Sequence, residues 1–326
     1  MTLRSTLALL VLASAGCDEL PPGDWSSPWF WGATFLAKYA AHLEIDELEP
    51  GPPPQGEPRT VLLITGVTIP ARWFDPIVAR LERDGFRPVV YEPPDLLSGS
   101  LFENAEELGR VIEQVRSESG QDRIDILAEC TGGVIARHYI QSLGGDRYVS
   151  RLVTFISPQN GVAAAPLAAK LVGWPALHDL SPGSAFLRAV QAVPLPPTVA
   201  VTSIYSCTDE YIQPYETSII PGATNLGICD RFVGHFEFFY DPDLYLLMHA
   251  ALVAPAPELP GARDDADTVE MEPAPAGCAA GGGPGASAGA LMVLAALLMR
   301  RRQPAIAEMR ASAVRKVRSS TSSSGE

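Results

Sequence analysis

The feature that most constrains the fold is a strand pattern that runs directly into a helix pattern at Cys130. Residues 124–133 read IDILAECTGG, an apolar run followed by two glycines. A side chain on such a turn is presented at the rim of a sheet, and it needs small neighbours two residues away on either side. Ala128 and Gly132 meet this need, so the stretch matches the G-x-S-x-G elbow with Cys130 at the nucleophile position.

The start of the helix after Cys130 gives this cysteine a polar environment. Helix N-termini carry a positive dipole and free N–H groups, which stabilise a thiolate or an oxyanion. We therefore expect a lowered thiol pKa. The alternative is a buried and inert thiol, as most free cysteines are.

The rest of the chain between residues 59 and 254 alternates between short apolar runs and helical patterns. Continuous apolar runs favour strands of a parallel sheet that is covered on both faces, and the alternation predicts an α/β, doubly wound sheet. We expect strands over residues 60–65, 88–91, 124–128, 152–156 and 199–205. We expect helices over residues 74–84, 104–119, 132–143 and 184–191.

Residues 60 to about 250 resemble the secreted triacylglycerol lipases and esterases of the α/β-hydrolase superfamily. The resemblance rests on Thr65-Gly66 after the first strand, the elbow at 128–133, the sequence SPQNG at 157–161 and the sequence DLSPGSAFL at 179–187. It implies a mainly parallel sheet with a small helical cap, which we expect within residues 161–197. Cysteine replaces the usual serine here, although dienelactone hydrolases also carry an elbow cysteine.

In this fold the nucleophile, the acid and the histidine follow one another along the chain. After the fifth expected strand, residues 206–214 resemble the acid loop of these lipases, so we assign Asp209 as the acid and keep Glu210 as an alternative. His235 is the histidine that lies where the family places its base. The other histidines precede the domain, precede the acid or fall within helices: His42, His178, His138 and His249.

The resemblance also implies an oxyanion hole that is formed by the backbone N–H groups of Val67 and Thr131. Cys207 and Cys229 flank the acid loop and the return to the histidine, and we expect them to form a disulfide. There is no Cys-x-x-Cys pair, and no histidine cluster has metal-ligand spacing. We expect no metal and no cofactor.

The two ends of the chain have the composition of targeting segments. Residues 1–17 resemble a signal peptide, and the small residues before Cys17 resemble a lipobox, in which this cysteine is lipidated. Residues 18–58 read as an aromatic helical segment and a Pro-rich linker, and 255–277 as a second linker. Residues 278–302, with Cys278, an apolar stretch and three arginines, resemble the MYXO-CTERM sorting tail, and 303–326 are basic and Ser-rich.

These features predict an exported acyl hydrolase that is held at the cell envelope through an N-terminal lipid, a C-terminal helix or both. Its substrate would be an acyl ester or a thioester. The net charge of −14 argues against a nucleic-acid partner, because a phosphate backbone needs a basic surface. Two alternatives remain: a non-catalytic protein that uses the fold to bind a lipid or a partner, and an acyltransferase that works through a thioester.

Overall fold

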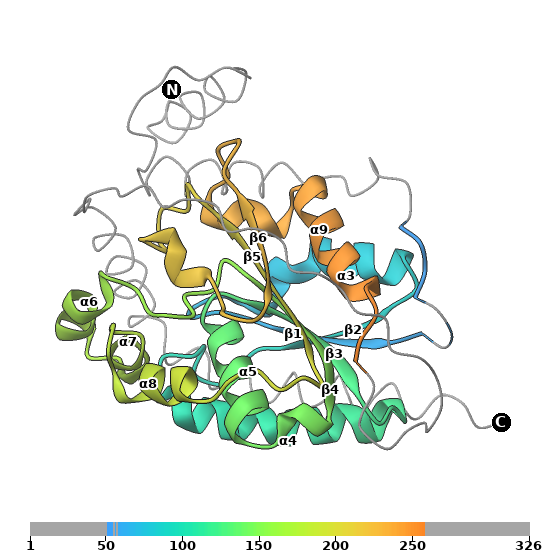
Figure 1. Cartoon of the computed structure of the whole chain (residues 1–326), viewed down its shortest axis with the longest axis horizontal. Helices are drawn as coiled ribbons and strands as arrows, with labels where there is room; N and C mark the ends of the chain where they lie inside the picture. The colour runs from blue at the N-terminus through green and yellow to red at the C-terminus, as the bar shows by residue number, and fades with distance from the viewer. Residues whose placement is uncertain (1–50, 55, 57, 258–326) are drawn as a thin grey trace, which may run out of the picture.

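The computed structural model describes residues 51–54, 56 and 58–257, and its centre is a six-stranded sheet (Figure 1). The strand order is β2-β1-β3-β4-β5-β6, and all five neighbouring pairs are parallel. The strands are β1 (Thr60–Ile64), β2 (Arg87–Tyr91), β3 (Ile124–Glu129), β4 (Val149–Phe155), β5 (Ala200–Ser206) and β6 (Thr224–Ile228). The expected doubly wound sheet is confirmed.

Burial explains which strands the sequence predicts well. Every residue of β1 and β3 is buried, and both are mostly apolar in the sequence, although β3 also contains Asp125 and Glu129. The edge strand β6 has the sequence TNLGI and is mostly exposed or half-buried, so it lacks an apolar run and was not expected. Strand β4 begins earlier than expected, at Val149, because the polar Arg151 is accommodated by an ion pair of 3.1 Å with Asp125 on β3.

Helices cover both faces of the sheet (Figure 1). Helices α4 (Leu101–Ser119) and α5 (Thr131–Ser142) pack on one face, and α3 (Asp75–Arg83) and α9 (Pro242–Val253) pack on the other. Each face has its own cluster of buried apolar side chains, which is why the strands between them are apolar on both sides. Short 3-10 helices lie in the connections: η1 (Ala71–Phe74), η2 (Gly145–Arg147), η3 (Tyr215–Ser218) and η4 (His235–Phe239).

Local signals explain where two of these helices begin and end. Helix α4 ends at Ser119 and is followed by Gly120, whose φ of 70° is easily adopted by glycine. Helix α9 begins at Pro242, and the side chain of Asp241 accepts hydrogen bonds from the N–H groups of Asp243 and Leu244. These caps fix the ends of two of the elements that sandwich the sheet.

The segment expected to form a cap contains α6 (Ala165–Val172), α7 (Pro175–Asp179) and α8 (Ala185–Ala192), which lie together at one end of the sheet (Figure 1). Phe186 and Leu187 of α8 are fully buried in the same cluster as α4 and α5. On α6, by contrast, Leu167 and Leu171 are each 59% exposed. The cap is therefore anchored by α8 and presents apolar side chains outward on α6.

The order in which strands are added to the sheet changes direction between β1 and β3, and this change locates the site. From β1 the chain moves to β2 on one side and then returns to β3 on the other side of β1. The loops that follow β1 and β3 therefore diverge, and ligands of open α/β sheets bind in the crevice that such a divergence leaves. Gly66 and Cys130 follow these two strands.

The predictions for the two ends of the chain concern residues outside the described ranges. These are the signal peptide with Cys17, most of the 18–58 segment, most of the second linker, the sorting segment with Cys278 and the basic tail. Within the part of the chain that the structure describes, no helix has the length and apolarity needed to cross a membrane.

Candidate active site

Cys130 lies on a strained turn between β3 and α5. Its φ of 48° and ψ of −122° are unusual for a non-glycine residue, and a positive φ was expected for an elbow. The small neighbour at Gly132 is required because a Cβ there would lie 2.7 Å from the backbone oxygen of Thr65. A Cβ on Gly66 would lie 2.7 Å from the Cβ of Cys130. Both loops of the crevice thus approach the cysteine closely.

The segment after β4 supports the back of this turn. The hydroxyl of Ser157 donates a hydrogen bond of 2.5 Å to the backbone oxygen of Cys130, and the Gln159 side chain donates to Ser157 Oγ at 2.8 Å. The backbone N–H of Cys130 donates to the oxygen of Phe155 at the end of β4. These contacts hold the strained backbone of Cys130 in place, and this support is the structural role of the SPQNG segment.

His235 and Asp209 form a hydrogen-bonded pair beside the cysteine. The distance between His235 Nδ1 and Asp209 Oδ2 is 2.7 Å. The other carboxylate oxygen of Asp209 accepts the backbone N–H groups of Tyr211 and Ile212 at 2.8 and 2.9 Å, which fixes its orientation. Cys130 Sγ, a ring nitrogen of His235 and an oxygen of Glu129 all lie within 4.8 Å of one another. The structure thus brings the three residues assigned from the sequence into one cluster.

Two further acids surround the imidazole. Glu210, the alternative acid, does not contact the ring but accepts the backbone N–H of His235 at 2.9 Å. Glu129 was not singled out from the sequence, because the elbow pattern leaves the residue before the nucleophile unspecified. Its Oε1 lies 3.5 Å from His235 Nε2, and its Oε2 accepts the N–H of Gly66 at 2.5 Å. Only the folded structure shows that this carboxyl group reaches the histidine.

The electrostatics of the cluster follow from its burial, since Cys130, Glu129 and His235 are at most 5% exposed. Burial and the nearby charge of Glu129 raise the pKa of the Cys130 thiol, and His235 only partly opposes them. The expected lowering of this pKa is therefore wrong: desolvation outweighs the helix N-terminus. For His235, burial acts to lower the pKa, but the charge and hydrogen bond of Asp209, with the nearby Cys130 and Glu129 side chains, raise it well above its ordinary value.

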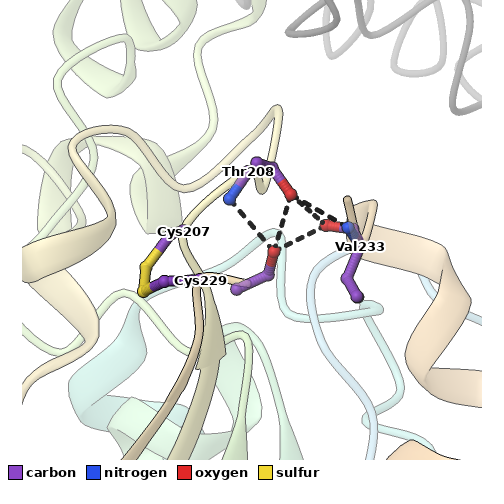
Figure 2. Close-up of a disulfide and its surroundings, with 5 residues drawn as sticks. Cys207, Thr208, Cys229 and Val233 are labelled. Atoms are coloured by element: carbon purple, nitrogen blue, oxygen red, sulfur yellow. Dashed lines mark hydrogen bonds between the residues drawn. A yellow bond between two sulfur atoms is a disulfide. The ribbon is translucent and has the colours of Figure 1, made fainter. Parts of the chain in front are cut away.

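The loops that carry the acid and the histidine are tied together (Figure 2). A disulfide joins Cys207 and Cys229, whose Cα atoms are 4.9 Å apart. Beside it, the hydroxyls of Ser206 and Thr208 both donate to the backbone oxygen of Val233, at 2.6 and 3.1 Å. Thr208 precedes Asp209, and Val233 lies two residues before His235, so these contacts set the distance between the acid loop and the histidine loop.

The two residues expected to form an oxyanion hole are the residue after Cys130 and the residue after Gly66, which approaches Cys130 closely. Thr131 is the first residue of α5, and its hydroxyl lies 3.7 Å from Cys130 Sγ. Val67 follows Gly66, the glycine that approaches Cys130. Their N–H groups belong to the two loops that flank the nucleophile position, where preorganised donors could stabilise negative charge on an acyl oxygen.

Comparisons with known proteins agree with this fold. The family model described as palmitoyl protein thioesterase matches residues 93–213, a range that includes Cys130 and Asp209. Lipase B of Pseudozyma antarctica is 29% identical over 213 residues, which are 64% of this chain and 60% of the relative. The chain therefore matches about 60% of the length of this curated relative.

Solved structures show the same architecture. The crystal structure of Aspergillus fumigatus lipase B is similar with a TM-score of 0.54 and 18% identity, over 80% of this chain and 77% of that one. The Bacillus licheniformis lipase BlEst2 in its propeptide form gives a TM-score of 0.53 and 14% identity, over 65% and 55% of the two chains. With its parallel sheet and these structural neighbours, the chain has the α/β-hydrolase fold.

Proposed function

We propose that this protein is an acyl hydrolase that cleaves thioesters and activated esters through an acyl-enzyme on Cys130. The observation that carries the proposal is the elbow cysteine next to an imidazole that is itself held by Asp209 at 2.7 Å. A nucleophile, a base and an orienting carboxylate in this order are the parts of a hydrolytic triad. The similarity to a palmitoyl protein thioesterase family model and to a lipase supports the same class of reaction.

The first half of the reaction uses the neutral thiol. His235 accepts the thiol proton as Cys130 Sγ bonds to the acyl carbon, and the N–H groups of Thr131 and Val67 stabilise the oxyanion. When the oxyanion collapses, the bond to the leaving thiol or alcohol breaks, and His235 returns the proton to it. Because the imidazole must be neutral before it can accept this proton, the raised pKa of His235 makes proton loss a precondition of attack.

In the second half, water replaces the leaving group. His235 removes a proton from the water, the resulting hydroxide adds to the acyl carbon, and the carbon–sulfur bond to Cys130 breaks. The sulfur takes the proton back, and the carboxylic acid is released. Asp209 keeps the imidazole oriented throughout, because it holds Nδ1.

The cysteine determines which acyl compounds react. In a tetrahedral intermediate made from an alkyl ester, the sulfur is a better leaving group than the alkoxide, so the intermediate reverts to the ester. A thioester or an aryl ester has a leaving group matched to the sulfur, and the reaction proceeds. The exposed leucines of α6 and the buried apolar cap favour an acyl chain rather than a charged group as the part that is bound.

A comparison of three proteins tests the proposal. Wild type should cleave palmitoyl thioesters and aryl esters faster than triacylglycerols, and Cys130→Ser should shift the preference toward simple esters. Cys130→Ala should lower kcat on both by about 10³-fold or more. Equal activity of wild type and Cys130→Ala would reject the hydrolase and favour the binding-protein alternative, for which the raised pKa of the buried Cys130 is the supporting observation. Added alcohol or amine acceptors would reveal acyl transfer.

We also propose that the protein is exported and held at the cell envelope. The support is the pattern of the two ends, with Cys17 after small residues and Cys278 before an apolar stretch and three arginines. Deleting everything after Pro275 should release the hydrolase into the medium. If the shortened protein stays with the envelope, the lipidated N-terminus is sufficient and the C-terminal anchor is not needed.

A further inference from the structure

The cluster at the elbow contains the ligand types of a zinc site. One sulfur, one imidazole nitrogen and one carboxylate oxygen, from Cys130, His235 and Glu129, lie within 4.8 Å of one another. Zinc binds such atoms at about 2.0 to 2.3 Å in a tetrahedral arrangement, which places two ligand atoms about 3.3 to 3.8 Å apart. The observed distance of 3.5 Å between His235 Nε2 and Glu129 Oε1 falls within this range.

The contacts around the cluster are those that orient metal ligands. A histidine that binds a metal through one nitrogen almost always donates from the other to a carboxylate, and His235 does so to Asp209 at 2.7 Å. The Oε2 atom of Glu129 is held by the N–H of Gly66. Among the residues that the structure describes, its fully buried Oε1 has no hydrogen-bond donor. An unsatisfied buried carboxylate oxygen that points at an imidazole needs a cation or a proton.

The acyl reaction does not explain Glu129. Asp209 already orients the imidazole, and Glu210 already binds the backbone of His235. No step of the proposed acyl reaction uses Glu129 Oε1, although this atom lies 3.5 Å from His235 Nε2. Acyl transfer therefore leaves this buried carboxyl group without a role.

We propose that Glu129, Cys130 and His235 bind one Zn²⁺ ion, with the fourth position open to water. The mixture of sulfur, nitrogen and oxygen suits Zn²⁺ and disfavours Mg²⁺ and Ca²⁺, which take oxygen ligands. The thiol loses its proton to solvent as the sulfur–zinc bond forms. Because the metal then occupies both the nucleophile and the base, Zn²⁺ is a reversible inhibitor of acyl cleavage. Metal binding rests on the geometry alone, and the inhibition rests on the proposed function.

Cobalt provides a spectroscopic test on the full chain. Co²⁺ substitutes for Zn²⁺, and a thiolate ligand gives it an intense near-ultraviolet charge-transfer band, with visible bands typical of a four-coordinate ion. We expect one Co²⁺ per wild-type chain with both features, displaced by one equivalent of Zn²⁺. Cys130→Ser should lose the charge-transfer band. Cys17 and Cys278 remain in every variant, so a band that survives Cys130→Ser would overturn the proposal.

Glu129→Gln is the decisive variant, because it keeps the cysteine and the histidine. It should weaken Zn²⁺ binding by about 10-fold to 100-fold or more, as measured by competition with a chelating dye. Glu210→Gln is the matched control, because it makes the same change in a buried acid that faces the backbone of His235. Its affinity should stay close to that of wild type. Thermal unfolding checks that each variant is folded. Equal affinities of folded wild type and folded Glu129→Gln would refute the site.

Activity measurements separate this inference from the proposed function. Chelator-treated wild type should hydrolyse thioesters, and added Zn²⁺ should inhibit it in proportion to occupancy, with Glu129→Gln requiring more Zn²⁺ for the same inhibition. If the treated protein is inactive but gives the cobalt spectrum, the hydrolase fails and the metal site stands. If it is active but gives no thiolate band, the metal site fails and the hydrolase stands.

Discussion

Removal of the Cys207–Cys229 disulfide should lower stability without disabling the site. The bridge joins the residues just after β5 and β6, and it closes a loop with a sequence separation of 22 residues that includes β6. In the chain-entropy description, a cross-link stabilises the folded protein by restricting the unfolded chain. The double substitution Cys207→Ala/Cys229→Ala removes this restriction and leaves no unpaired thiol behind.

The loop length sets the magnitude of the loss. A closed loop of this length corresponds to about 3 kcal/mol at 25 °C, and for a domain of this size that is a decrease in Tm of about 6 to 12 °C. The hydrogen bonds of Ser206 and Thr208 to Val233 do not involve the sulfur atoms, so they remain in the variant (Figure 2). The spacing of the acid and histidine loops should persist, and kcat at low temperature should stay near that of wild type.

Urea unfolding and initial rates together test this reasoning. The double variant should lose about 3 kcal/mol in the free energy of unfolding, and wild type in reductant should lose a similar amount. Thr208→Val should show the opposite balance, with a smaller loss of stability and a larger loss of kcat, because Thr208 lies next to Asp209. The reasoning would be refuted if the double variant lost kcat as strongly as Thr208→Val while its stability was unchanged.

Three further substitutions test the elbow, the sheet and the helical face. Gly132→Ala should destabilise the protein by about 1 to 3 kcal/mol and reduce alkylation of the folded-state cysteine, because its Cβ would meet the backbone oxygen of Thr65 at 2.7 Å. Asp125→Ala should cost about 3 kcal/mol in urea unfolding, because it leaves the buried Arg151 without its carboxylate partner. Burial lowers the pKa of His138, so as pH falls below about 6.5 the unfolded chain binds a proton that the folded chain does not, and the folded protein loses stability. His138→Leu should recover part of this loss, as measured by Tm against pH.

The sequence predicted the elements that are buried on both faces. Strands β1 and β3 are fully buried, and an apolar run is a reliable signal for such strands. It also placed Cys130, Asp209 and His235, because the order of these residues in the fold and their positions after strands restrict the choice.

Elements and groups that depend on tertiary context were not predicted. Strand β6 lies at the edge of the sheet, where one side is open to solvent, and its sequence TNLGI lacks the apolar residues that identified the other edge strand, β2. The thiol pKa was expected to fall because the helix N-terminus is visible in the sequence. The burial of the Cys130 thiol and the approach of Glu129 are visible only in the folded structure, and they raise the thiol pKa instead.

The three acids around His235 do not have equal reasons to be buried. Asp209 binds the ring and is held by two backbone N–H groups, so it orients the imidazole. Glu210 binds the backbone N–H of His235, and burial together with the charge of Asp209 raises the pKa of Glu210 to about 8, so near neutral pH it is mainly uncharged and costs little. Burial also raises the pKa of Glu129, yet one of its oxygens faces the imidazole without a donor among the described residues. The fold uses Oε2 of Glu129 to hold Gly66, but neither the fold nor acyl transfer to Cys130 uses its Oε1, and a cation shared with the thiol and the imidazole would satisfy that atom.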